Sequence, residues 1–232
     1  MRDAFLVALT DLGHKDRRIR LVTADIGFES VFHRELPDQF LNVGVAEQIM
    51  VGMAAGMALR GLRPVCYTIA PFALYRPFEF IRNDICLQRL PVIIVGMGAG
   101  DLPYPSLGRT HQANEDLFIA KAIGLTLLTP CDPRETVECL EYAFSLGKPC
   151  YLRLGKTGEP DLTEQASPFT PGAGRFLRHG SDHLIIGYGP ILGKAKDIDP
   201  LATVVSLPTE TAFNTTQYKK VTVLEDHQPF IK

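Results

Sequence analysis

The stretch FLNVGVAEQIMVGMAAGMALRGLRPVCYT, residues 40–68, contains the patterns of a strand, a helix and a second strand in succession. Residues 40–43 and 63–68 are short runs typical of strands. Residues 46–60 are rich in Ala, Met and Gly and are typical of a buried helix, which stops at Gly61. Two strands joined through a helix lie parallel in one sheet. The stretch therefore predicts a parallel sheet covered by helices.

The same alternation continues on both sides of this unit. Further strands are expected at residues 19–24, 91–96, 126–129 and 149–153. Further helices are expected at residues 2–12, 77–87, 117–123 and 134–146, the last with Asp132 as its N-cap. The pattern is that of an α/β fold with a doubly wound parallel sheet. Ligands of such sheets bind beyond the carboxyl ends of the strands.

A change of composition divides the chain. Residues 158–174 are rich in Pro, Gly, Thr and Ser, which predicts a linker between a first domain, residues 1–157, and a smaller unit, residues 175–232. The smaller unit has a short helix pattern at 192–197 and three strand patterns, at 184–187, 203–207 and 221–224. Because so short a unit buries little core, we expect a truncated second α/β domain.

The overall composition excludes several classes of function. The chain has 232 residues, 46% hydrophobic and 22% charged, with a net charge of −2, which is ordinary for a soluble globular protein and leaves no basic stripe for nucleic acid. Its apolar runs are too short for a bilayer and its N-terminus does not resemble a signal peptide, so we expect no membrane partner and a cytoplasmic location. Its five cysteines lack CxxC spacing, which favours reduced, buried thiols over a zinc site.

Glu47 is the strongest single candidate for chemistry. It follows a strand and begins a helix, where a carboxylate commonly does no more than stabilise the helix dipole. Its neighbours Val43, Val45, Ile49 and Met50 are apolar, so we expect the carboxyl to be removed from water. A carboxyl in such surroundings can hold or share a proton near neutrality. That is the condition for donating a hydrogen bond to a ring nitrogen.

Seven segments occur in an order that resembles the pyrimidine-binding domain of transketolases. They are NVGVAEQ, VGMAAGMALRGLRPVCYT, PFALYRPFEFIRND, LPVIIVG, GRTHQANEDL, TPCDPRE and PCYLRLGK, and they cover nearly all of residues 1–157. GVAEQ and RTHQ are modest motifs alone, but the joint order and spacing are highly specific. 1-Deoxyxylulose-5-phosphate synthases and the β subunits of 2-oxo-acid dehydrogenases share most of the order. The resemblance implies an enzyme that uses thiamine diphosphate.

The resemblance implies roles for Glu47 and for a group of aromatic residues. Glu47 matches the glutamate that hydrogen-bonds N1′ of the aminopyrimidine and promotes the imino tautomer, which removes the C2 proton of the thiazolium. One or more members of the cluster Phe72, Tyr75, Phe78 and Phe80 should stack on the aminopyrimidine, with Phe72 and Tyr75 as first choices. Their helical spacing fits ordinary core packing equally well.

The resemblance also implies substrate-binding residues. His111 matches a histidine placed near the substrate carbonyl, where it stabilises charge or moves a proton, although a loop histidine is often a plain surface residue. Arg153 matches an arginine that binds the sugar phosphate, and a surface ion pair is the equally common alternative. Arg76 and Arg109 are weaker candidates for phosphate binding.

The chain departs from transketolases at two places. Leu107 stands four positions before His111, where transketolases carry an acidic residue that contacts a substrate hydroxyl, and Asp101 is the nearest residue that could compensate. The segments RFLRHGSDHLIIGYG and VTVLEDHQPFIK resemble the start of the transketolase C-terminal domain, but in shortened form. We therefore do not expect a standard pattern of substrate hydroxyl contacts, and we expect altered packing or dimer contacts.

One motif is missing from the sequence. Enzymes of this family hold the cofactor diphosphate through Mg²⁺ with a GDG motif, and the chain contains no GDG. We therefore expect no metal site in this chain. A partner subunit of the N-terminal transketolase type should carry the Mg²⁺ and diphosphate half, with an α2β2 assembly and the active site at the interface.

These observations lead to one preferred function and three alternatives. The preferred function is the pyrimidine-binding subunit of a split transketolase that transfers a two-carbon ketol unit between sugar phosphates or related sugars. A subunit of a deoxyxylulose-phosphate-synthase-like or 2-oxo-acid-decarboxylating carboligase uses the same cofactor. A non-catalytic subunit would keep the fold without chemistry. A Rossmann-type nucleotide binder is disfavoured because no GxGxxG follows the first strand.

Overall fold

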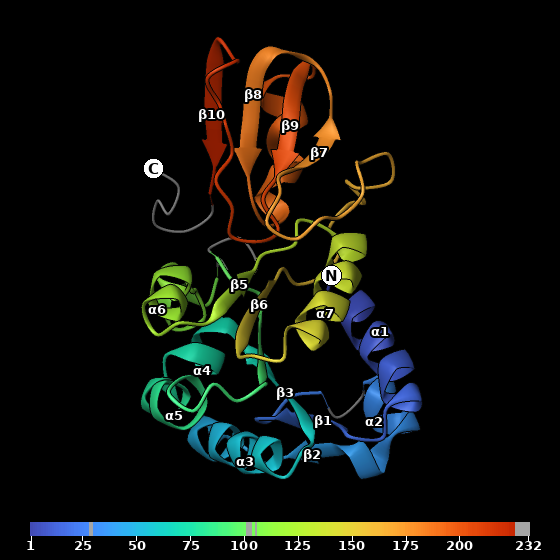
Figure 1. Cartoon of the computed structure of the whole chain (residues 1–232), viewed down its shortest axis with the longest axis vertical. Coiled ribbons are helices and arrows are strands. Elements are labelled where there is room, and N and C mark those ends of the chain that lie inside the picture. The colour runs from blue at the N-terminus through green and yellow to red at the C-terminus, as the bar shows by residue number, and fades with distance from the viewer. Residues whose placement is uncertain (28–29, 101–103, 105, 226–232) are drawn as a thin grey trace.

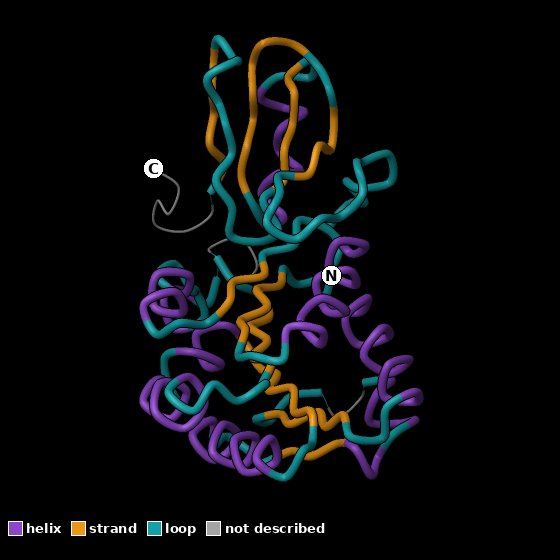
Figure 2. Tube along the Cα trace, in the orientation of Figure 1, coloured by secondary structure: helices purple, strands orange, loops and turns teal. Residues whose placement is uncertain are grey.

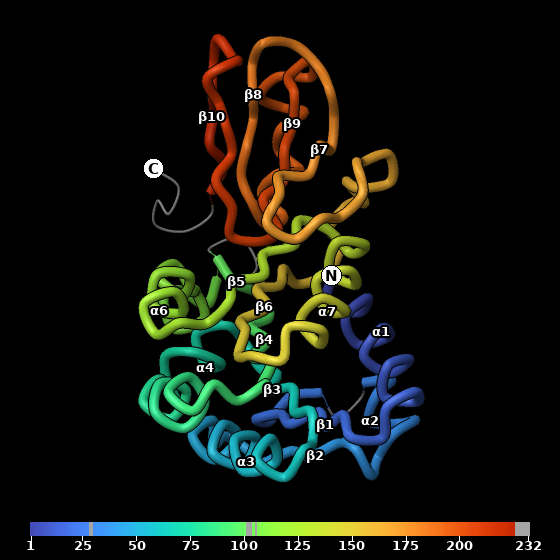
Figure 3. Tube along the Cα trace, in the orientation of Figure 1, coloured from blue at the N-terminus to red at the C-terminus, as the bar shows by residue number. Residues whose placement is uncertain are grey.

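Six parallel strands form the central sheet in the part of the chain that the structure, a computed structural model, describes: residues 1–27, 30–100, 104 and 106–225. Their order across the sheet is β2-β1-β3-β4-β6-β5 (Figures 1 and 3). The strands are β1 (Ile19–Thr23), β2 (Phe40–Asn42), β3 (Arg63–Ile69), β4 (Ile93–Met97), β5 (Thr126–Leu128) and β6 (Cys150–Leu154). The expected α/β class and parallel sheet are confirmed.

Helices cover both faces of this sheet. One group lies on one face and the second on the other, as Figure 1 shows. The first group is α1 (Arg2–Lys15), α2 (Val31–Glu35) and α7 (Pro133–Leu146). The second is α3 (Glu47–Leu59), α4 (Ala70–Leu74), α5 (Phe78–Phe80) and α6 (Asp116–Ala122).

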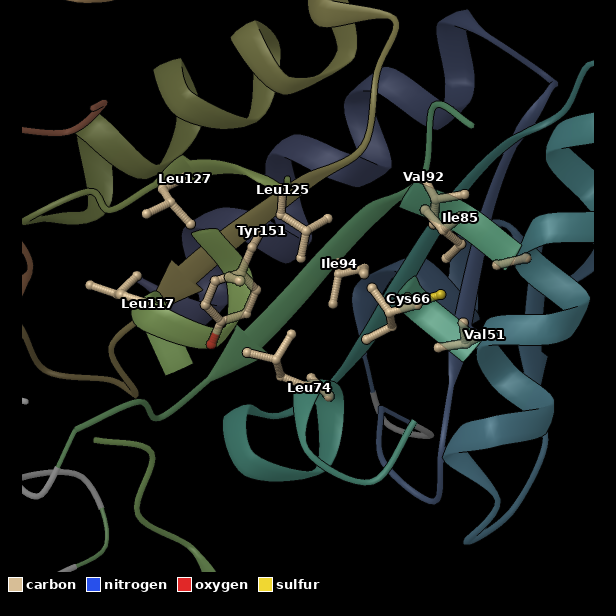
Figure 4. Close-up of a cluster of buried hydrophobic side chains, with 14 of the residues drawn as sticks. Val51, Cys66, Leu74, Ile85, Val92, Ile94, Leu117, Leu125, Leu127 and Tyr151 are labelled. Carbon is tan, nitrogen blue, oxygen red and sulfur yellow. The ribbon is translucent and has the colours of Figure 1, made fainter. Parts of the chain in front are cut away.

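Strand alternation explains how one sheet makes two cores. In β3, Cys66 faces the core under α3 and α4, whereas Val65 and Tyr67 face the core under α1 and α7. In β4, Ile94 faces the core under α3 and α4, and Val95 faces the core under α1 and α7. Successive side chains of a strand point to opposite faces, so a strand buried on both faces is apolar throughout. Figure 4 shows the α3 side of this arrangement.

Two short helices were not expected from the sequence. α2 and α4 have five residues each, which is less than two turns and too short for a clear 3.6-residue period. The single helix expected at residues 77–87 is divided into α5 and a π-helical segment, Ile81–Cys86. Pro77 stands just before α5 and cannot supply a backbone N–H, so the chain turns between α4 and α5.

A second sheet follows, with the order β10-β8-β9-β7. Its strands are β7 (Arg175–Arg178), β8 (Ser181–Gly187), β9 (Ala202–Ser206) and β10 (Lys220–Leu224). The sequence indicated three of these strands, and β7 was missed. β7 is the antiparallel edge strand and pairs only with β9 in the described residues. The short helix expected at 192–197 is present as a 3₁₀ turn, Pro190–Lys194, followed by α8 (Ala195–Ile198).

Residues 158–174 connect the two sheets as an irregular segment (Figures 2 and 3). One buried carboxylate anchors this segment. Asp132 caps α7 by accepting a hydrogen bond of 2.7 Å from Glu135 N with Oδ1, as its N-cap assignment predicts. Its Oδ2 accepts from Leu162 N, Thr163 N and Thr163 Oγ1, each at 2.7 Å. The segment is therefore attached to the first sheet by polar contacts.

Candidate active site

Glu47 lies at the first position of α3, directly beyond the carboxyl end of β2. Asn42 holds the turn between β2 and Glu47, because its Oδ1 accepts hydrogen bonds from Gly44 N at 2.8 Å and from Asp25 N at 3.1 Å. Glu47 is only 3% exposed, so the expected burial is present. Its neighbours Val45 and Ile49 are 69% and 56% exposed, however, and do not supply that burial. The covering groups come from other elements of the fold.

Arg76 is the partner of Glu47. Arg76 follows α4, and its Nη1 donates to Glu47 Oε1 at 2.7 Å. The same guanidinium lies over the ring of Phe72, with 3.8 Å from Cζ to the ring centroid. The Arg76 side chain is 43% exposed and that of Glu47 only 4%. The Glu47 carboxylate, the Arg76 guanidinium and the Phe72 ring thus form a row in space in which each group contacts the next.

His111 extends this row. It follows the 3₁₀ turn Gly108–Thr110 in the loop after β4, and its ring meets Phe72 edge-on with 5.1 Å between centroids. His111 Nδ1 lies 2.9 Å from Thr110 Oγ1. Three segments that follow β2, β3 and β4 therefore place Glu47, Phe72 and His111 together at the carboxyl edge of the sheet. A parallel sheet collects the loops that follow its strands at one edge.

Tyr75 and Arg109 meet at a different residue. The Tyr75 hydroxyl donates to Glu115 Oε2 at 3.1 Å and accepts from Glu115 N at 3.2 Å. Burial is the main cause that raises the pKa of Tyr75 above its usual range, so the hydroxyl stays neutral. Arg109 Nη2 donates to Glu115 Oε1 at 2.8 Å, and its side chain is 78% exposed. Glu115 thus links Tyr75, at the end of α4, to Arg109, in the loop that carries His111.

Arg153 is buried in this chain. Its side chain is 2% exposed, and its Nε donates to Asp116 Oδ2 at 2.8 Å. Tyr151 OH donates to the same oxygen at 2.8 Å, and Arg153 Nη2 donates to Ala113 O at 3.3 Å. Burial and the neighbouring Asp116 charge raise the pKa of the Tyr151 hydroxyl well above its usual value, so it stays a donor. The arrangement is a buried structural ion pair between β6 and α6.

A well-formed cavity lies elsewhere in the chain. It has a volume of about 470 Å³ and is lined by α6, β5 and the second sheet, including Leu117, Phe213 and Val221. The row from Glu47 to His111 does not line it. The Arg76 side chain is 43% exposed, so this member of the row can be reached from the surface. Neither a group of three or more potential metal ligands nor a helix long and apolar enough to cross a membrane occurs among the described residues.

Comparison with known proteins identifies the family. The family model described as the pyrimidine-binding domain of transketolase matches residues 1–158. The chain belongs to the transketolase family. This finding confirms the family that the seven ordered segments indicated, and thiamine diphosphate is the cofactor that this family implies.

Relatives of the transketolase family differ in how much of their length the chain matches. The chain is 32% identical over 211 residues to a subunit of the apulose-4-phosphate transketolase of Actinobacillus succinogenes, covering 84% of this chain and 68% of the relative. It is also 32% identical over 218 residues to 1-deoxy-D-xylulose-5-phosphate synthase of Chlorobium phaeovibrioides, covering 91% of this chain but 34% of the synthase. The chain thus spans about one third of the synthase.

Solved structures support the same grouping. A split-gene transketolase, described as an inactive β4 tetramer, is 33% identical, with a TM-score of 0.78 over 90% of this chain and 71% of that chain. Transketolase of Campylobacter jejuni has the same TM-score at 20% identity, which shows the fold alone. The chain covers only 35% of the Campylobacter protein.

Within this transketolase fold, the structure brings some of the expected site residues together and separates others. Glu47, Phe72, His111 and the weaker candidate Arg76 form one row, whereas Arg109 and Tyr75 meet at Glu115. Phe78 lies on α5 and is 37% exposed.

Asp116 holds the Arg153 guanidinium in the interior of this chain, and phosphate binding by Arg153 stays a prediction. Leu107 is 49% exposed, and Asp101 lies outside the described residues.

Three contacts could not be found from the sequence. The Arg76–Glu47 pair joins residues 29 positions apart, and Arg153–Asp116 joins residues 37 positions apart. Glu115, which joins Tyr75 and Arg109, stands in the quoted segment GRTHQANEDL but had no assigned role. The resemblance indicated that this segment is a functional loop. The tertiary contacts show that its two acidic residues, Glu115 and Asp116, bind other side chains of the chain.

Proposed function

We propose that the chain is the pyrimidine-binding subunit of a two-chain, thiamine-diphosphate-dependent transketolase that transfers a two-carbon ketol unit between sugar phosphates. One observation carries the proposal. A flat cation, the Arg76 guanidinium, lies on the Phe72 ring and donates a hydrogen bond to the buried carboxylate of Glu47. A flat heteroaromatic ring with a polarised ring nitrogen fits the same pair of contacts, one to its face and one to its edge.

The residues of this row have separate roles in the proposal. When bound, thiamine diphosphate supplies the carbanion chemistry. Glu47 holds a proton at the ring nitrogen N1′, and the Phe72 ring supports the face of the aminopyrimidine. His111 stands beside Phe72 and can hold or move a proton at the substrate carbonyl oxygen. The fold thus supplies orientation and proton control, while the reactive carbon belongs to the cofactor.

A partner subunit completes the site in this proposal. The sequence contains no GDG motif, so the partner binds Mg²⁺ and the diphosphate. An open apolar surface for it lies beside Glu47, because Val45, Ile49 and Met53 are 69%, 56% and 39% exposed on and just before α3. An exposed apolar stripe on a helix is typical of an interface. The similarity to one subunit of the apulose-4-phosphate enzyme and to a split-gene transketolase supports a two-chain enzyme, and α2β2 is the assembly we propose.

Phosphorylated sugars are the proposed substrates. Two relatives that are named as subunits of apulose-4-phosphate transketolases support this class, each at 32% identity. The exposed Arg109 supplies a cation near His111 that can meet a phosphate. Leu107 replaces the acidic residue that contacts a substrate hydroxyl in transketolases, so we expect a donor whose hydroxyl pattern differs from that of standard ketose phosphates.

A deoxyxylulose-phosphate-synthase-like activity is the second candidate, favoured by the 32–37% identity to such synthases. The two reactions differ in one product. A carboligase of that type releases CO2 from pyruvate, whereas ketol transfer releases none. Incubation of the assembled enzyme with labelled pyruvate therefore separates them.

Reconstitution tests the proposed function. The chain is purified alone and together with the subunit that co-purifies with it, and ketol transfer is measured with a panel of ketose phosphates. We expect activity only in the complex, together with cofactor binding that depends on Mg²⁺. Micromolar cofactor affinity in the isolated chain, or an assembled complex that binds no thiamine diphosphate, would contradict the proposal.

A further inference from the structure

We infer that Arg76 occupies the place of the aminopyrimidine in the unloaded subunit, and that the cofactor must displace it. This inference rests on the proposed function and adds a competing group within the chain itself. Arg76 satisfies the two side chains that would receive the ring. It lies over the face of Phe72 at 3.8 Å and donates to Glu47 at 2.7 Å.

The chemistry of the guanidinium suits this role. It is planar and delocalised, it stacks on aromatic rings, and its N–H groups donate in the plane. An aminopyrimidine that stacks on Phe72 and bonds Glu47 through a ring nitrogen makes the same two contacts. Two flat groups cannot lie on the same face of the Phe72 ring at the same time. Binding of one therefore excludes the other.

An exposed cation protects a buried anion in this arrangement. Glu47 is only 3% exposed, and a buried carboxylate without a partner is costly. Arg76 supplies a partner until the ring arrives. When Arg76 leaves, the ring nitrogen takes over the contact to Glu47 and the ring takes over the contact to Phe72. Neither side chain then loses its partner.

Arg76 can leave without disturbing the fold. Its side chain is 43% exposed, and the contacts that the structure gives it within the described residues are those with Glu47 and Phe72. A long, flexible side chain at the surface can turn into water. The contact is also modest, since pairs with one exposed partner are partly screened by solvent. We therefore expect removal of Arg76 to strengthen cofactor binding by about two- to ten-fold.

Cofactor titration of the assembled enzyme tests the inference. Arg76→Ala removes both contacts. Arg82→Ala is the matched control, because Arg82 is an exposed arginine of the π-helical segment Ile81–Cys86 whose side chain bonds only Asn83 in the described residues. The dissociation constant of thiamine diphosphate is measured by calorimetry at saturating Mg²⁺. We expect a two- to ten-fold lower constant for Arg76→Ala and a change of less than two-fold for Arg82→Ala. An unchanged or raised constant for Arg76→Ala overturns the inference.

The isolated chain supplies a second readout that needs no cofactor. Glu47→Gln, Arg76→Ala and the double variant form a cycle whose unfolding equilibria are measured in urea. We expect a coupling of about two- to ten-fold between the two sites, and the absence of coupling overturns the inference.

The two proposals fail in different ways. If the wild-type complex binds no cofactor, the proposed function falls and the inference falls with it. If the wild-type complex binds the cofactor but Arg76→Ala binds it no more tightly, only the inference falls.

Discussion

Arg153 Nε lies 2.8 Å from Asp116 Oδ2, and the two side chains are 2% and 0% exposed. This buried pair fastens the end of β6 to the start of α6. The corresponding arginine of the family motif suggested phosphate binding, whereas this environment favours a structural role for Arg153.

Removal of Arg153 should destabilise the chain. Arg153→Met leaves the Asp116 carboxylate buried without its cation, which typically costs about 3–5 kcal/mol of unfolding free energy. Urea unfolding of the isolated chain followed by circular dichroism measures the loss.

The double variant Arg153→Met/Asp116→Leu is the control, because it removes both charges and should recover much of the lost stability. A normal unfolding midpoint for Arg153→Met, with a raised KM for phosphorylated substrates in the complex, would restore the phosphate-binding assignment.

Glu47→Gln should stop proton exchange at the cofactor. Because glutamine keeps the shape but cannot carry the acidic proton, we expect the exchange rate of the cofactor C2 proton in deuterated water to fall by about 10²–10⁴-fold. Proton NMR of the loaded complex after acid quench measures the rate. Glu141→Gln, on an exposed position of α7, should leave it unchanged. Equal rates in wild type and Glu47→Gln would remove Glu47 from the chemistry.

Phe72 rather than Tyr75 should support the pyrimidine. The Phe72 ring lies between Arg76 and His111, whereas the Tyr75 hydroxyl is held by Glu115. Phe72→Leu removes the aromatic face and should weaken cofactor binding by about ten-fold, from the loss of stacking and contact area. Tyr75→Phe keeps the ring and should change the affinity by less than two-fold. Calorimetric titration of the complex distinguishes the two; the opposite ranking would assign stacking to Tyr75.

Asp132 should hold residues 158–174 in place against the start of α7. Asp132→Ala removes the α7 cap and the acceptor for Leu162 and Thr163, so we expect a loss of about 2–4 kcal/mol in stability, combining the cap with several buried hydrogen bonds. Limited proteolysis with chymotrypsin should then cut within 158–174 at lower enzyme concentration. Glu164→Ala is the control, because Glu164 is an exposed carboxylate of the same segment, and it should be cleaved like the wild type.

The thiols should be slow to react in the folded protein. The five cysteines are free, and four of them are fully enclosed: Cys66, Cys131, Cys139 and Cys150. Burial raises the pKa of Cys66 and Cys150 to about 12 and that of the half-buried Cys86 to about 11. At pH 8 we expect slow labelling of Cys86 alone by a maleimide, and five labelled sites in urea. Rapid labelling of a second thiol in the native chain would contradict this burial.

Local patterns were sufficient for the main architecture. The apolar runs of β3 and β4, the Ala- and Gly-rich helix α3 and the Asp132 cap are decided by residues close in the sequence, which is why their positions could be predicted. β7 could not, because an antiparallel edge strand of four residues owes its conformation to β9, which lies beyond β8 in the sequence. α2 and α4 were too short to show a period.

The sequence alone was enough to predict the parallel sheet, the family and the position of Glu47 at the start of α3, although α3 is buried on one face only. Only the tertiary structure decided the partners: Arg76 for Glu47, Asp116 for Arg153 and Glu115 for Tyr75. The physical reason is that periodicity and capping act within a few residues, whereas a side chain's charge partner and exposure depend on segments that the parallel sheet brings to one edge. The burial of Glu47 was expected from its neighbours along the chain, but Val45 and Ile49 are exposed, and the hydrogen-bond partner of Glu47 stands 29 residues away.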